Sequence, residues 1–171
     1  MKAKVAASLH RATDRGRLPV VCDASSCTEG LQILLDAAGE RGIRVVDAVA
    51  FVDEHVLPHL PPAQRVASLT LHPTCSSHHL GIGDALTRVA SAAAETVVIP
   101  EDWGCCAFAG DRGMLHPELT ASATAPEATG VEVAASVAHA SLNRTCELGM
   151  TRATGHDYRH ELQVLDEALP H

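Results

Sequence analysis

Six cysteines are the residues of this sequence best suited to do chemistry. No two of them are separated by two residues, so the CxxC pairs typical of zinc ribbons and of thioredoxin-type redox sites are absent. Thiolates are the usual ligands of iron–sulfur clusters. Widely spaced thiols that include an adjacent pair favour a cluster of several metal atoms over a single tetrahedral ion. The cysteines are Cys22, Cys27, Cys75, Cys105, Cys106 and Cys146.

Five of these cysteines follow a predicted strand. Short apolar runs predict strands over 18–22, 65–71, 96–99 and 137–142, and Cys27, Cys75, the pair Cys105-Cys106 and Cys146 come after them in that order. The carboxyl ends of parallel strands meet at one edge of a sheet, where α/β folds place their ligand sites. Helix N-termini at the same edge favour thiolate. Cys22 falls inside a strand, and we expect it to be a small core residue.

The rest of the pattern alternates strands with helices. Helical periodicity predicts helices over 27–40, 79–94, from Pro117 onward, 146–153 and 157–169, where Tyr158, Leu162, Leu165 and Leu169 share a face. A β-branched run predicts a further strand over 43–52, and three prolines predict a loop over 57–62. This order predicts one α/β domain over 1–171, with a mainly parallel sheet and helices on both faces.

Composition narrows the class of partner. Thirteen lysines and arginines against 21 aspartates and glutamates give a formal charge of −8, which disfavours nucleic acid. Residues 1–17 lack the apolar region of a signal peptide, and no stretch has the roughly 18 apolar residues of a membrane span. We therefore expect a cytoplasmic protein, in which cysteines serve as metal ligands or redox groups rather than as disulfide partners.

The sequence also contains a short internal repeat. Residues 25–31 align with residues 144–150, and each segment has a hydroxyl residue before its cysteine and a glycine followed by an apolar residue after it. Both segments lie where a strand passes into a helix. We therefore interpret residues 1–40 as the end of a preceding repeat and 41–171 as a full unit.

These residues resemble the cysteine-rich CCG domain, in which a lead cysteine, a CCG motif and a CxxC motif follow one another, usually in two copies. The domain occurs in heterodisulfide reductase B and glycolate oxidase iron–sulfur subunits and at the C-terminus of FAD-linked D-lactate dehydrogenase-like oxidoreductases. Three segments stand in the places of its motifs, and three more resemble the flanks of the FAD-linked branch. The motif segments are His72-Pro73-Thr74-Cys75, Cys105-Cys106-Ala107 and Asn143-Arg144-Thr145-Cys146; the flanks are 23–27, 109–113 and 116–123.

The resemblance implies an iron–sulfur electron-transfer module of a FAD-dependent D-lactate or other 2-hydroxy acid dehydrogenase. Cys75, Cys105, Cys106 and Cys146 would be its metal ligands, and Cys27 the closing cysteine of a preceding copy. Its partners would be upstream flavin and ferredoxin-like domains and a membrane electron acceptor, which would keep the parent enzyme at the membrane periphery. Upstream parts would carry the FAD, and this chain would not be catalytic alone.

Two departures from the family pattern concern the ligand set. Asn143 stands where the family has the first cysteine of CxxC, which removes one ligand unless another residue, such as Cys27, His72, His78 or Asn143 itself, joins the site. Ala107 replaces the glycine of CCG and adds a methyl group where the backbone bends.

Two other interpretations of the thiols stay open. His72, His78 and His79 surround Cys75 in the sequence, and imidazole and thiolate are ordinary zinc ligands. The alternative is that His72 is a turn residue and that the other two face solvent. A structural or interaction domain with zinc-bound or free thiols is therefore the competing function. A third interpretation is disulfide chemistry at Cys105-Cys106, where a vicinal disulfide would be easily reduced.

Overall fold

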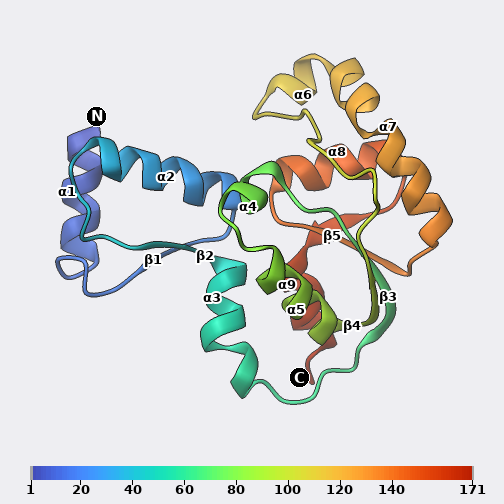
Figure 1. Cartoon of the computed structure of the whole chain (residues 1–171), viewed down its shortest axis with the longest axis horizontal. Coiled ribbons are helices and arrows are strands. Elements are labelled where there is room, and N and C mark those ends of the chain that lie inside the picture. Colours follow the sequence, from blue (N-terminus) through green and yellow to red (C-terminus); the bar gives the residue numbers. More distant parts are fainter. Residues whose placement is uncertain (1, 171) are drawn as a thin grey trace.

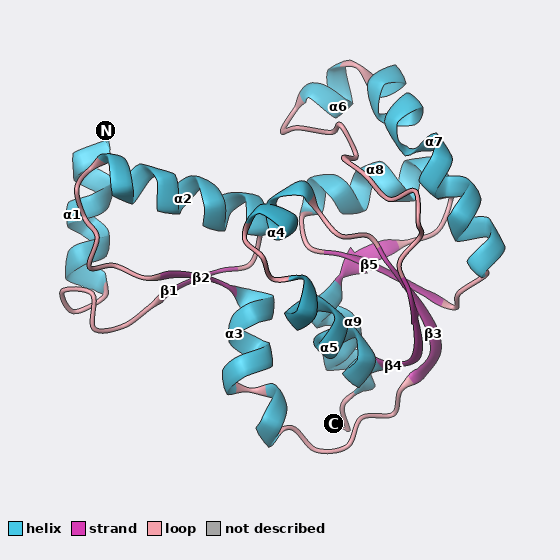
Figure 2. Ribbon diagram, in the orientation of Figure 1, coloured by secondary structure: helices cyan, strands magenta, loops and turns pink. Residues whose placement is uncertain are grey.

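The computed structural model describes residues 2–170, which fold into a four-stranded and a two-stranded parallel sheet flanked by helices (Figures 1 and 2). This confirms the predicted α/β class. In chain order the elements are α1 (Lys2–Ala12), β1 (Val20–Cys22), α2 (Ser25–Ala37), β2 (Val45–Asp47), α3 (Ala48–His55), η1 (Leu57–His59), β3 (Val66–Leu71), α4 (Cys75–His79), α5 (Gly83–Ala93), β4 (Ala94–Val98), α6 (Arg112–Leu115), α7 (Pro117–Ala134), β5 (Ala138–Ser141), α8 (Arg144–Thr154), β6 (Tyr158–His160) and α9 (Glu161–Ala168). None of the helices in this described part is long and apolar enough to cross a membrane.

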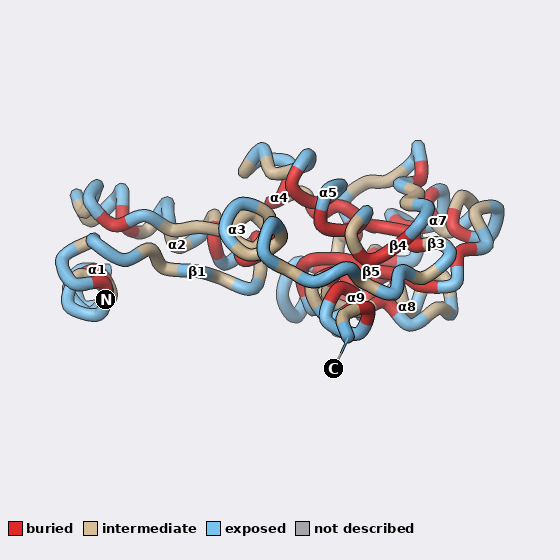
Figure 3. The backbone as a smooth tube through the Cα atoms, turned by 90° about the horizontal axis from the view of Figure 1, so that it is seen from below, coloured by how far each residue is buried: buried red, intermediate tan, exposed pale blue. Residues whose placement is uncertain are grey.

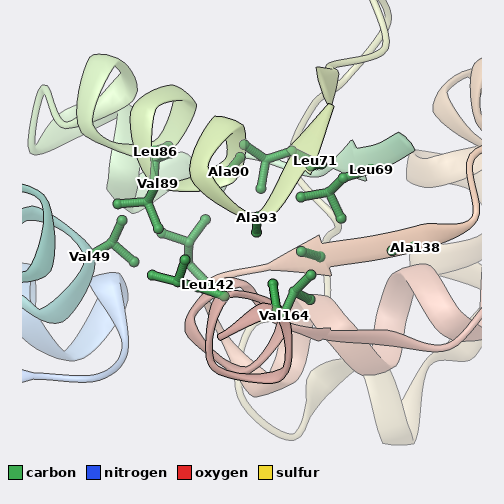
Figure 4. Packing of buried hydrophobic residues seen from close by; sticks show 14 residues of the cluster. Val49, Leu69, Leu71, Leu86, Val89, Ala90, Ala93, Ala138, Leu142 and Val164 are labelled. Carbon is green, nitrogen blue, oxygen red and sulfur yellow. The ribbon is translucent and has the colours of Figure 1, made fainter. Parts of the chain in front are cut away.

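The larger sheet has the strand order β4-β3-β5-β6 and carries a helical layer on each face. Helices α5 and α9 cover one face and, with part of α3, enclose the main hydrophobic core (Figure 4). Helices α7 and α8 pack against each other and cover the other face. Buried chain is concentrated in this part of the molecule, whereas the region of β1 and α2 is mostly half-buried or exposed (Figure 3).

Strand β3 shows how the sequence divides between the two faces. Leu69 and Leu71 belong to the core with α5 and α9. Thr70 and His72 alternate with them and so face the α7–α8 layer. There the Thr70 hydroxyl bonds Ser136 and the His72 ring bonds Glu127 of α7. The same alternation that builds the core therefore delivers His72 to the opposite side of the sheet.

The short sequence repeat extends into a structural repeat. The unit β1-α2-β2-α3 has the same element order as β5-α8-β6-α9, and both strand pairs are parallel. Their registers correspond, because Cys22 pairs with Asp47 as Ser141 pairs with His160. Cys27 and Cys146 are each the third residue of their helices. In this comparison the first unit spans 20–55 and the second spans 138–168.

Three predicted elements differ from the structure. The predicted strand over 43–52 ends at Asp47, because the Asp47 carboxylate accepts a hydrogen bond from the Val49 amide and starts α3. The predicted helix over 157–169 begins as strand β6, so Tyr158 pairs with His139 instead of sharing a helix face. The predicted helix over 79–94 is divided at Gly81, whose φ of +68° is left-handed and separates α4 from α5.

Candidate metal centre

Three buried side chains converge at the carboxyl edge of the larger sheet. His72 directly follows β3, Cys106 lies in the loop after β4, and Cys146 is in the first turn of α8 after β5. Since β3 lies between β4 and β5, the three residues come from adjacent strand ends. One ligand atom from each lies within 4.8 Å of the other two. This distance lets one metal ion contact all three.

Cys106 and Cys146 form the inner thiol pair of this group. Their sulfur atoms are 3.0 Å apart, and both side chains are buried. The hydrogen bond with Cys146 lowers the pKa of Cys106 to about 5, against the effect of burial and with help from nearby His72. The same hydrogen bond, together with burial, raises the pKa of Cys146. At neutral pH the pair therefore consists of one thiolate and one thiol, and the thiolate is ready to bind a metal.

Glu127 orients the His72 ring. The Nδ1 atom of His72 lies 2.8 and 2.9 Å from the two carboxylate oxygens of Glu127, and both side chains are fully buried. Nε2 is buried and has no hydrogen-bond partner within residues 2–170, which leaves it for a metal. Burial by itself lowers the pKa of His72, but Cys106 and Glu127 outweigh it and raise the value to about 9. A carboxylate behind an imidazole ligand is the usual support of a protein metal site.

Cys75 and Cys105 form an outer pair of thiols. Cys75 is the first residue of α4, which Thr74 and Ser77 cap reciprocally, and its side chain is half-buried. Burial and the neighbouring thiol of Cys105 raise the pKa of Cys75 to about 11, and Cys106 contributes further. Cys105 is exposed, and its sulfur accepts a hydrogen bond of 3.4 Å from the Ala107 amide. The outer pair therefore connects the buried pair with the surface.

The loop that carries Cys105 and Cys106 is held by Phe108. This ring is fully buried, and the Arg152 guanidinium lies 5.4 Å from its centre. Gly113 packs so closely against Phe108 that a Cβ on this glycine would lie 2.5 Å from the ring. Ala107 has a φ of +53°, in the left-handed region where glycine is favoured. Ala107 therefore holds a strained conformation beside the thiols.

Other sequence candidates lie outside the inner group. Cys27 is exposed at the start of α2, and Cys22 is half-buried rather than in the core. His78 is exposed and its ring centre lies 6.2 Å from that of Trp103. Asn143 is buried and contacts hydroxyl groups of Ser25 and Ser76. By contrast, His72 is completely buried and belongs to the group with Cys106 and Cys146.

Glu127 contacts the site but is not among the candidate residues that the sequence suggests. It lies in the middle of α7, 55 positions from His72 in sequence. The helical period could have indicated Glu127, because it recurs at helical spacing with the other buried residues of α7. These buried residues are Thr120, Thr124, Glu127 and Val131. A carboxylate at an inward-facing helical position requires a buried partner. The period alone cannot name that partner.

Comparison with known proteins adds no assignment, since no protein-family model and no curated protein matches the chain. The geometry is therefore the basis for interpretation. The donor set of one imidazole and up to four thiols, with an unpartnered buried Nε2, fits a metal centre with thiolate ligands. The group of His72, Cys106 and Cys146 could hold a metal ion.

Proposed function

We propose that this protein is an iron–sulfur electron-transfer module, with Cys75, Cys105, Cys106 and Cys146 as the thiolate ligands. The observation that carries the proposal is the convergence of these four cysteines from three separate strand ends. Strand β3, which Cys75 follows, lies between β4 and β5, and the sulfur atoms of Cys106 and Cys146 are 3.0 Å apart. The Cys105 thiol is the neighbour of Cys75 and raises its pKa. Thiolates in such a group are the ligands that iron–sulfur clusters require.

The residues of the proposed centre would hold it from two sides, one buried and one nearer the surface. Cys106 and Cys146 would anchor the inner side, where burial excludes water, and Glu127 would keep the His72 ring directed at the same place. Cys75 and Cys105 would hold the outer side, where Cys105 is exposed to a partner. When bound, an iron–sulfur cluster supplies one-electron redox chemistry. The division keeps one side of the centre protected and leaves the other open to electron exchange.

The wider role that we propose is transfer of electrons from a flavin to an acceptor in a FAD-dependent D-lactate or other 2-hydroxy acid dehydrogenase of the cytoplasm. The flavin, the ferredoxin-like clusters and a membrane acceptor would belong to partner domains or proteins. The likeness of the cysteine motifs to the CCG domain supports this context. The free thiols of all six cysteines are consistent with a reducing compartment.

The test is the iron and acid-labile sulfide content per chain after anaerobic reconstitution, measured together with the visible absorption spectrum. We expect iron and sulfide in a cluster-like ratio and a charge-transfer absorption that Cys106→Ser abolishes. Cys22→Ser is the matched control, because Cys22 lies in β1 and outside the group. Wild-type protein that takes up no iron under these conditions would contradict the proposal.

A second function, a structural zinc site, is favoured by one specific observation. The hydrogen bonds between His72 and Glu127 are typical of the carboxylate–histidine support of zinc ligands. In this case His72, Cys106 and Cys146 would be ligands, and Cys75 or Cys105 would complete a tetrahedron. Elemental analysis separates the two functions, because the zinc site predicts one zinc per chain, no sulfide and no redox signal.

A further inference from the structure

Four buried polar side chains form a hydroxyl–amide cluster beside the candidate metal centre, and they come from both structural units and from the α4 segment between them. The cluster consists of Ser25 from α2, Thr74 and Ser76 around the start of α4, and Asn143 before α8. The Ser25 hydroxyl lies 2.7 Å from that of Thr74 and 2.9 Å from that of Ser76. It also donates to the Asn143 side-chain oxygen at 3.4 Å. Ser25 is completely buried, so these contacts replace its hydration.

Two partners of Ser25 lie at the starts of the helices that present Cys75 and Cys146. Thr74 caps α4, accepting a hydrogen bond from the Ser77 amide, and Cys75 is the next residue. Asn143 is the residue before α8, and its backbone oxygen accepts the hydrogen bond of the Glu147 amide around Cys146. The Asn143 side chain also lowers the pKa of Cys146, although the contact with Cys106 and burial raise it more. Ser25 therefore contacts Thr74, whose side chain caps the helix of Cys75, and Asn143, the residue before the helix of Cys146.

Asn143 explains why this connection exists in the present chain. Its amide nitrogen donates to the Ser76 hydroxyl at 3.4 Å, and its oxygen also accepts from the Ser26 amide at 3.3 Å. A thiol in its place would be a weak donor and acceptor and could not bridge these groups. The amide thus joins the cluster of hydroxyl groups and also acts on the neighbouring Cys146 thiol.

We propose that Ser25 is a positioning residue for the metal centre, acting through Thr74 and Asn143 to set the separation of the Cys75 and Cys146 sulfur atoms. The inference rests on the proposed function, since it assigns Ser25 a role in ligand geometry. It also gives the first structural unit a part in the site, although Cys27 of that unit lies outside the ligand group. Ser25 does not bind the metal. It determines how well the two ligands fit it.

The test compares Ser25→Ala with Ser136→Ala and Ser25→Thr. Ser136 is a matched control because its hydroxyl is also buried and bonds Thr70 at 2.8 Å, but it lies at the amino end of β5, away from the thiols. Ser25→Thr keeps the hydroxyl. The first readout is a Co²⁺ titration of the reduced protein, followed by thiolate-to-cobalt absorption. We expect Ser25→Ala to weaken Co²⁺ binding roughly 10- to 100-fold and to change the absorption per bound ion. Ser136→Ala and Ser25→Thr should keep the wild-type Co²⁺ affinity and the wild-type absorption per bound ion.

The second readout is amide hydrogen exchange of the metal-free proteins, which depends on no ligand. Ser25→Ala should raise exchange about 10-fold in residues 74–80 and 143–147, and Ser136→Ala should not. Wild-type Co²⁺ affinity and absorption in Ser25→Ala, or unchanged exchange in both segments, would overturn the inference. Failure of the proposed function would look different, because wild-type protein would then take up no iron while the exchange difference at Ser25→Ala persisted.

Discussion

Glu127 and His72 join the middle of helix α7 to the carboxyl end of β3 through a completely buried contact, with both carboxylate oxygens within 2.9 Å of Nδ1. Burying a pair of this kind costs desolvation free energy unless the polar atoms of both groups find partners. The contact determines which ring nitrogen faces the thiols, because the other is occupied. Helix α7 thus orients a side chain of the candidate metal centre, although it contributes no ligand itself.

Replacing Glu127 by glutamine should weaken metal binding without moving a ligand. The amide keeps the size of the side chain but loses the negative charge that holds Nδ1 and makes Nε2 a better donor. We expect Co²⁺ affinity to fall roughly 10- to 100-fold in a spectroscopic titration. Glu132→Gln is the control, since Glu132 is exposed on the same helix. Equal affinities for the two variants would show that Glu127 has no role at the centre.

Replacing Ala107 by glycine should stabilise the protein. The left-handed φ of +53° costs an alanine roughly 1–2 kcal/mol. The greater freedom of glycine in the unfolded chain offsets part of this gain. We expect the free energy of unfolding in urea to rise by about 0.5–1 kcal/mol. Ala125→Gly in the exposed face of α7 should instead lower it by about 1 kcal/mol. A loss of stability in both variants would mean that residue 107 is not strained.

Replacing Gly113 by alanine should displace the loop that carries the adjacent cysteines. The new Cβ would lie 2.9 Å from the Cα atom of Phe108 and closer still to its ring, and a backbone atom cannot move aside as a flexible side chain would. We expect a loss of about 1–3 kcal/mol in unfolding free energy and weaker Co²⁺ binding. Gly104→Ala tests the explanation, because a Cβ at Gly104 meets no atom within 4 Å. Stability equal to that of Gly104→Ala would refute the steric argument.

Replacing Glu161 by glutamine should change how stability depends on pH. Burial raises the pKa of Glu161 well above its usual value, and the nearby Asp47 carboxylate raises it further. Above a pH of about 4.5 the unfolded chain loses this proton while the folded chain keeps it, so stability falls as pH rises, by up to about 1.4 kcal/mol per pH unit. The fall ends at the folded pKa.

Urea unfolding at a series of pH values measures this effect. The difference in stability between Glu161→Gln and wild type should grow in favour of the variant from a pH of about 4.5 upward. Asp166→Asn on the exposed face of α9 should follow the wild-type profile. Parallel profiles for Glu161→Gln and wild type would contradict a protonated Glu161 in the folded state.

Local sequence patterns predicted most of the fold, because each strand and helix has its own hydrophobic period and its own residues that mark where it starts and ends. Strand β3 and the start of α7 at Pro117 lie where apolar runs and helix-start signals predict them. Two of the errors occur where a short strand passes directly into a helix, at Asp47 and His160, and the third is the left-handed turn at Gly81. At Asp47 and His160 a side chain caps the helix without an intervening turn residue, so one sequence pattern spans two elements.

The strand-end argument predicted the region of the candidate site but not its inner composition. It directed attention to Cys75, Cys105, Cys106 and Cys146 because it needs only the order of elements. Burial of His72 depends on the phase of β3, which a single sequence does not fix for the residue just after the end of a strand. The pairing of His72 with Glu127 depends on how α7 packs on the sheet, which is a tertiary property.

The protonation of the inner group has a consequence for how a metal enters. With pKa values of about 9 for His72 and about 5 for Cys106, and a raised value for Cys146, the metal-free site at neutral pH holds an imidazolium, a thiolate and a thiol. Both the imidazole nitrogen and the second sulfur must lose a proton before they can donate to a metal. Loading of this site is therefore an exchange of metal for protons. Calorimetric heats of loading will vary with the ionisation enthalpy of the buffer, and acidification will favour release.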